Sequence, residues 1–91
     1  MVVATARVVI RISHCHSLKE KRSVLRPILA QLQRQFQLSV AEVEEQDRWQ
    51  TGVIGLACVS GDVRHAESVV ARAVSFMERQ MRDAEVVETG N

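Results

Sequence analysis

Basic side chains gather near the start of the chain at a spacing that suits the binding of an anion. The group comprises Lys19, Lys21, Arg22 and Arg26, preceded by His14 and His16. Unpaired backbone N–H groups and the helix dipole already favour an anion at the start of a helix, and cationic side chains add to that field. RNA phosphates would suit such a surface, since charge contacts dominate sequence-independent affinity. We therefore expect anion or RNA binding here, and a solvated helix end without a ligand is the alternative.

Other groups that could do chemistry lack the partners that the chemistry needs. The acidic residues are Glu42, Glu44, Glu45 and Asp47, and the candidate metal ligands are His14, Cys15, His16, Cys58 and His65. Carboxylates can act as acid and base, but no partner base is visible, so a solvated strand face is the simpler interpretation. A His-x-His pair without a clear third and fourth ligand is weak support for a metal site. We expect no catalytic residues, no metal, no cofactor and no enzymatic activity.

Hydrophobic periodicity predicts the elements that must position these groups. Apolar residues alternate over 2–12, and the runs 39–46 and 51–60 also have strand character. The last strand is predicted over 84–89. Trp49 falls in the loop between the predicted strands 39–46 and 51–60. Trp49 either folds back onto the core or projects as an interface anchor.

Two helices are predicted between these strands. Ser17-Leu18-Lys19-Glu20 fits a capping box, and an apolar stripe at helical spacing follows it. Pro27 interrupts the stripe, which predicts either one bent helix or a helix proper that starts near Val24. Asp62 is a suitable N-cap for the second helix.

The element order β-α-β-β-α-β predicts an α+β fold. Two amphipathic helices need one apolar sheet face to cover, which favours a ferredoxin-like split β-α-β sandwich. In this arrangement a four-stranded antiparallel sheet carries both helices on one face. The length of 91 residues predicts a single domain over 1–91.

The predicted sheet leaves one face without helices. Its strands place Val3, Val9, Val53, Val59, Gly55 and Ala57 on that face, together with Arg7 and Arg11. An apolar face of this kind is usually covered. A homodimer through this face is one expectation, with Arg7, Arg11 and Trp49 as interface residues and with the arginines meeting acids such as Glu42 or Glu44. A solvent-exposed mixed face is the alternative.

Composition and charge limit the class of protein. The net charge of +1 hides an asymmetry: residues 1–38 hold seven basic and one acidic residue, net +6, and residues 39–91 hold five and ten, net −5. A basic half favours an anionic partner, unless the halves neutralise each other within the fold. Two widely spaced cysteines are typical of free thiols in a reducing compartment. No apolar run has the length of a membrane span, so we expect a cytoplasmic protein without membrane contact.

Three stretches carry a resemblance to a known family. They are Ser17-Leu18-Lys19-Glu20-Lys21-Arg22, Glu45-Gln46-Asp47 followed by Trp49-Gln50, and Val59-Ser60 with Asp62 and His65-Ala66-Glu67. In order and spacing they resemble the YlxP-like family of small bacterial proteins, domain of unknown function 503. The resemblance implies a ferredoxin-like fold and no established activity. The family's genes tend to lie beside those for ribosome-binding factor A and translation initiation factor two, which implies a role near the ribosome.

The expected function is therefore a small binding protein associated with RNA or the ribosome through the basic first helix. Its partner would be ribosomal RNA or a ribosomal subunit. The alternative is a homodimeric interaction or regulatory module that binds no nucleic acid.

Overall fold

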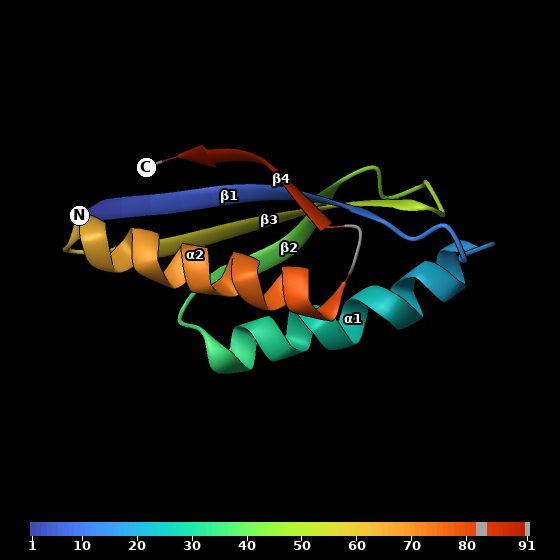
Figure 1. Ribbon diagram of the computed structural model, residues 1–91, viewed down its shortest axis with the longest axis horizontal. Helices are drawn as coiled ribbons and strands as arrows, with labels where there is room; N and C mark the ends of the chain where they lie inside the picture. The colour runs from blue at the N-terminus through green and yellow to red at the C-terminus, as the bar shows by residue number, and fades with distance from the viewer. Residues whose placement is uncertain (82–83, 91) are drawn as a thin grey trace.

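A computed structural model of the protein describes the backbone of residues 1–81 and 84–90 and the side chains of residues 1–81. The elements follow in the order β1 (Val2–Arg11), α1 (Leu18–Gln35), β2 (Ser39–Glu44), β3 (Thr51–Ser60), α2 (Val63–Gln80) and β4 (Ala84–Gly90). Figure 1 shows both helices beneath the sheet, so that one sheet face carries the helices and the other carries none.

The core forms between the helices and the facing side chains of β1 and β3. The alternation predicted for these strands is confirmed: Ile10 and Ile54 are fully buried, and Cys58 is nearly so. The antiparallel ladder of β1 and β3 runs without interruption from Val2 opposite Ser60 to Arg11 opposite Thr51. Helix α2 packs on both of these strands, whereas α1 lies mainly against β2.

The predicted four-stranded antiparallel sheet of a ferredoxin-like sandwich was wrong, although the fold is of the predicted α+β class. Three antiparallel strands, in the order β2-β3-β1, form the sheet whose side chains are described, and β4 follows at the β1 edge. The β1–β4 ladder shifts its register between Arg7 and Val8. The stretch Ala84–Gly90 has two adjacent valines and no clean alternation to fix a register. The corrected description is an α+β fold with two helices on a three-stranded antiparallel sheet, to which β4 is joined irregularly.

Helix α1 is one continuous helix despite Pro27. It begins at Leu18 and ends at Gln35, with Pro27 inside it, so a start near Val24 is wrong. Proline lacks the N–H that would bond to the carbonyl of Ser23 one turn earlier. Because the apolar stripe continues on both sides of Pro27 and packs on the core, burial of Leu25 and Leu32 compensates for the missing bond.

Gly52 permits a close approach of α1 to β3. A Cβ atom at this position would lie 3.3 Å from Leu25 Cδ1 and 3.7 Å from Lys21 Cε. Even a Cβ atom there would require the Leu25 side chain to shift by a few tenths of an ångström. The glycine therefore helps to bring Lys21 over the end of β3, where it meets the β2–β3 loop.

Candidate functional site

The start of α1 is capped as predicted, and the cap affects where an anion would bind. The Ser17 hydroxyl accepts a hydrogen bond from the Glu20 backbone N–H at 3.1 Å, and the Glu20 carboxylate accepts one from the His16 N–H at 3.3 Å. The first bond satisfies one helix-end donor. The second joins Glu20 to the residue before the N-cap, one position earlier than in the predicted capping box, and places a negative charge at the helix start. A second anion is disfavoured at the helix end itself, so binding would depend on the basic side chains further along α1.

Three of the predicted anion-binding residues share one exposed face of α1. Lys19, Arg22 and Arg26 are all exposed to solvent. Their spacing of three and four residues places them side by side on a helix. With Ser23 and Pro27 they line a shallow hollow of about 480 Å³. Among the side chains that the structure describes, no acidic group forms an ion pair with any of the three, so their charges face the solvent.

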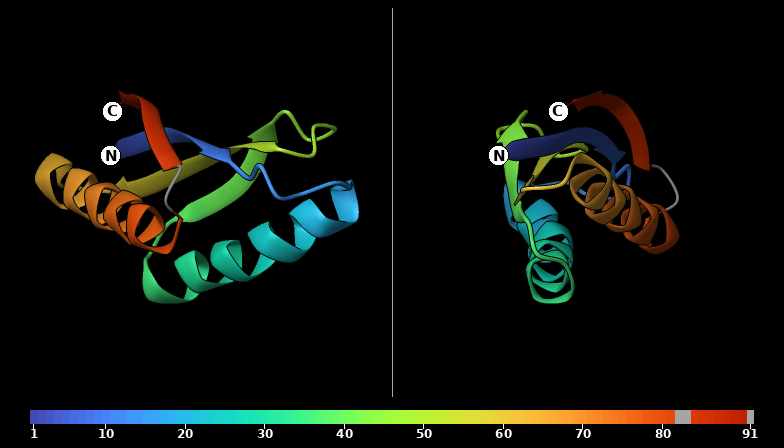
Figure 2. Two further views of the ribbon diagram at one scale, coloured as in Figure 1. Left: turned by 45° about the vertical axis from the view of Figure 1, so that its right-hand side comes forward. Right: turned by 90° about the vertical axis from the view of Figure 1, so that its left-hand side faces the viewer.

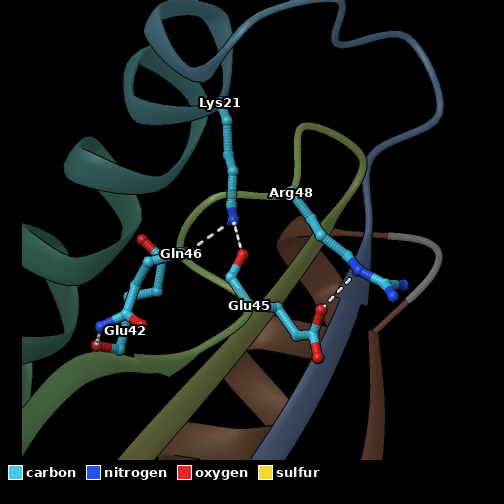
Figure 3. A network of polar contacts seen from close by, with 5 residues as sticks. All are labelled: Lys21, Glu42, Glu45, Gln46 and Arg48. Atoms are coloured by element: carbon cyan, nitrogen blue, oxygen red, sulfur yellow. Dashed lines mark hydrogen bonds and ion pairs between the residues drawn. The ribbon is translucent and has the colours of Figure 1, made fainter.

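Lys21 does not belong to this surface, which corrects the prediction that it binds an anion or RNA. Its side chain is 1% exposed and points into the protein. The ammonium donates a hydrogen bond to the backbone carbonyl of Glu45 at 2.7 Å and lies 2.6 Å from Glu42 Oε2 (Figure 3). That oxygen is buried without an aligned hydrogen-bond donor, so its contact with Lys21 is one of charge.

Lys21 lies on the apolar stripe of α1, and this signal was available in the sequence. It stands three residues after Leu18 and four before Leu25, both on the side of the helix that faces the protein. A lysine at such a position is buried only if it is paired. Its basic neighbours Lys19 and Arg22 are close to it in the sequence but lie on the exposed side of the helix.

The β2–β3 loop is braced from two sides. Strand β2 ends at Glu44 instead of the predicted Gln46 because Glu45 takes a left-handed backbone conformation with φ of 59°. The Glu45 carbonyl accepts bonds from Lys21 and, at 3.1 Å, from the Arg48 N–H, and the Glu45 carboxylate pairs with Arg48 Nε at 2.7 Å (Figure 3). Gln50 Nε2 donates to the carbonyls of Ser13 at 3.1 Å and Cys15 at 3.2 Å.

The bracing residue Gln50 was not singled out by the sequence reasoning as functional. A glutamine in a polar loop has no periodicity that would reveal its partners 35 and 37 residues away. The contacts tie the loop before α1 to the loop before β3.

The acidic residues singled out in the sequence do not form one group. Glu42 faces Lys21, Glu45 faces Arg48, and Asp47 is exposed.

Trp49 projects from this braced loop. Its side chain is 51% exposed, which favours the projecting alternative over the one in which it caps the core. Beside it lies an open hollow of about 380 Å³, lined by Asp47, Arg48, Trp49, Gln50 and Thr51. The start of α1 and this loop lie at the same end of the molecule in both views (Figures 1 and 2).

Arg7 and Glu44 form a bidentate pair on the helix-free face. Arg7 Nε lies 2.9 Å from Glu44 Oε1, and its terminal nitrogen lies 3.1 Å from Oε2. The hydrogen bond from Arg7 holds the pKa of the Glu44 carboxyl below its ordinary value. The pair joins β1 to β2 across β3, where the register places Val53 between Val9 and Glu44. Val53 is 3% exposed, although its predicted place on the helix-free face suggested that it would be exposed to solvent.

Arg11, the other predicted interface arginine, is exposed at the end of β1. It lines a hollow of about 310 Å³ together with His14 and residues from both helices. Arg7 and Arg11 therefore lie in different surroundings: Arg7 meets an acid of its own chain, as the sequence reasoning allowed, and Arg11 lies near the loop before α1.

The candidate metal ligands are dispersed. Cys15 is fully buried, and burial raises the pKa of its thiol, with a smaller contribution from Glu20. Cys58 is buried in the core, whereas His14 and His16 are exposed. Over the described part of the chain, no three His, Cys, Asp or Glu side chains are grouped as metal ligands would be.

Neither helix has the length and apolar content that crossing a membrane requires.

Comparison with known proteins supports the resemblance seen in the sequence. The family described as "Protein of unknown function (DUF503)" matches residues 3–90. The Bacillus subtilis (strain 168) protein named "Uncharacterized protein YlxP" is 40% identical over 62 residues, which make up 68% of this chain and 67% of that relative. The match to the family extends over nearly all of the chain, from β1 to β4. The chain therefore belongs to the DUF503 family of proteins of unknown function.

Proposed function

We propose that this protein binds structured RNA, with ribosomal RNA or a ribosomal subunit as its partner, through the basic face of α1. The observation that carries the proposal is the exposed group Lys19, Arg22 and Arg26, which has no acidic partner among the described side chains. Cationic side chains of this kind contact phosphates and release counterions, which makes affinity dependent on salt. The family's implied gene neighbourhood beside ribosome-binding factor A supports the same partner.

The charge distribution also favours an anionic partner for this part of the molecule. The first 38 residues hold a net charge of +6, and the structure removes only part of it by internal pairing. Lys21 pairs with Glu42, and Arg7 pairs with Glu44. The α1 face retains its charge, and a continuous basic face raises the association rate with a polyanion.

The test is a salt titration of binding to a structured ribosomal RNA fragment. The double variant Arg22→Glu with Arg26→Glu should weaken binding at low salt by at least ten-fold. It should also reduce the slope of log affinity against log salt by about 1.4–1.8, because each of the two lost phosphate contacts contributes about 0.7–0.9. Fluorescence anisotropy of a labelled RNA measures both quantities.

The matched control is Arg72→Glu with Arg79→Glu on the exposed side of α2. This variant changes the net charge by the same amount on a helix outside the proposed site. Equal losses in the two variants would mean that total charge, and not the α1 face, governs binding. Unchanged binding in the α1 variant would refute the proposed site.

A second candidate function is a homodimeric interaction module that uses the helix-free sheet face. Two exposed valines favour it, Val59 at 63% and Val43 at 45%, near an apolar hollow of about 330 Å³ along β2 and β3. Sedimentation equilibrium should then give a dimer that Val59→Asp dissociates. Val63→Asp is the control, because Val63 is 41% exposed at the start of α2 on the other layer.

A further inference from the structure

We propose that Trp49 stacks against an unpaired RNA base in the hollow of the β2–β3 loop. This inference rests on the proposed RNA binding and names the form of RNA that the site takes: an unpaired nucleotide next to a structured segment. In this arrangement the basic face of α1 holds phosphates and Trp49 holds a base.

The first observation is the contrast between Trp49 and the remaining aromatic residues. The chain has one tryptophan, two phenylalanines and no tyrosine. Phe36 and Phe76 meet edge to face within the core, with ring centroids 6.0 Å apart. Trp49 is 51% exposed, although burying its ring would be favourable. An exposed tryptophan on a loop is a surface suited to a flat ligand.

The second observation is that hydrogen bonds and an ion pair hold the loop residues on either side of Trp49 before any ligand arrives. Lys21 anchors the Glu45 carbonyl from α1. Gln50, the residue after Trp49, donates hydrogen bonds to the carbonyls of Ser13 and Cys15. Arg48, the residue before Trp49, is tied to Glu45 through both backbone and side chain. Pre-ordering of this kind lowers the entropy lost when a ligand binds.

The third observation is the chemistry of the hollow beside the indole. Its other lining residues, Asp47, Arg48, Gln50 and Thr51, are polar or charged. The Arg48 guanidinium pairs with Glu45 through Nε, and its terminal nitrogens point away from Glu45 (Figure 3). A nucleobase has a flat face for the indole and polar edges for such donors and acceptors. An apolar protein segment would offer no partner to the Asp47 carboxylate or to the terminal nitrogens of Arg48, so the lining favours a base.

The position of the loop fits this division of roles. The β2–β3 loop, which carries Trp49, lies at the end of the molecule at which α1 begins (Figures 1 and 2). Lys19 and Arg22 lie in the first two turns of that helix. An RNA whose phosphates contact this part of α1 therefore passes the end of the molecule that carries the loop.

The experiment uses the single tryptophan as its own reporter. The probes are an RNA hairpin with unpaired loop bases, a fully paired duplex of the same length, and inorganic polyphosphate. Stacking on a base should quench Trp49 fluorescence with the hairpin and not with polyphosphate. By anisotropy of labelled RNA, Trp49→Leu should weaken hairpin binding about ten-fold, leave duplex binding unchanged, and be largely rescued by Trp49→Phe.

Each outcome decides between this inference and the function on which it rests. If hairpin and duplex bind equally, and Trp49→Leu changes neither, the stacking role is overturned while RNA binding by α1 stands. If the hairpin binds without quenching, the stacking role is likewise overturned. If no RNA binds at low salt, both proposals fail. Circular dichroism of Trp49→Leu checks that the fold persists, as expected for a half-exposed side chain.

Discussion

Replacing Lys21 with methionine should destabilise the protein strongly, because methionine keeps most of the aliphatic chain and removes only the ammonium. The Glu45 carbonyl then loses its 2.7 Å hydrogen bond from the ammonium and keeps the one from the Arg48 N–H, and a hydrogen bond to a charged group contributes about 1.5–3 kcal/mol. Glu42 loses its cationic partner, which costs about 3–5 kcal/mol for a fully buried pair. Since the Glu42 side chain is 22% exposed, water offsets part of this cost. We expect a total loss of about 3 kcal/mol.

The assay is urea unfolding followed by circular dichroism, supported by thermal unfolding. A loss of about 3 kcal/mol in a domain of this size lowers the melting temperature by roughly 12–24 °C. Lys19→Met is the matched control, because Lys19 is exposed and lacks an acidic partner among the described side chains. Its effect should stay within about 0.5 kcal/mol. Adding Glu42→Gln to Lys21→Met should recover about 1 kcal/mol, because it removes the unpaired carboxylate.

Two results would contradict this reasoning. If Lys21→Met costs less than about 1 kcal/mol, the buried ammonium contributes little beyond its aliphatic chain. If Glu42→Gln brings no recovery in the Lys21→Met background, the carboxylate does not depend on Lys21. Either result would also weaken the inference that Lys21 holds the β2–β3 loop in place.

Two further predictions follow from the ion pair on the sheet and from the proline in α1. Because Arg7 holds the pKa of Glu44 below its ordinary value of 4.5, the pair stabilises the fold above that pH and loses its effect as pH falls through the lowered pKa. Glu44→Gln should therefore lower the urea midpoint at about pH 7, and its difference from wild type should shrink at about pH 3; a constant difference would exclude the linkage. Pro27→Ala restores an N–H that can bond to the Ser23 carbonyl, so it should raise the free energy of unfolding by about 1–3 kcal/mol; a loss of stability would show that Pro27 packs favourably where it is.

Local signals in the sequence determined where most elements lie. Strand β3 matches the predicted range 51–60, and both helix starts match their predicted N-caps, Ser17 and Asp62. These features are readable because alternation, helical spacing and capping depend on residues only a few positions apart. The exposed basic residues Lys19, Arg22 and Arg26 could be predicted for the same reason, since helix phase decides which side chains share a face.

Tertiary structure decided the pairings between distant residues. The partners of Lys21 lie more than 20 residues further along the chain, and Arg7 and Glu44 are 37 residues apart. The sequence proposed Glu42 or Glu44 for the arginines but could not assign them, because the choice depends on the register of β1, β3 and β2 and on the face to which each acid turns. The pairing of β4 could not be predicted either, because its register against β1 shifts between Arg7 and Val8. The contacts of Lys21 and Gln50 likewise fix the loop that carries Trp49, and the Lys21 contact exists only once α1 has packed on the sheet.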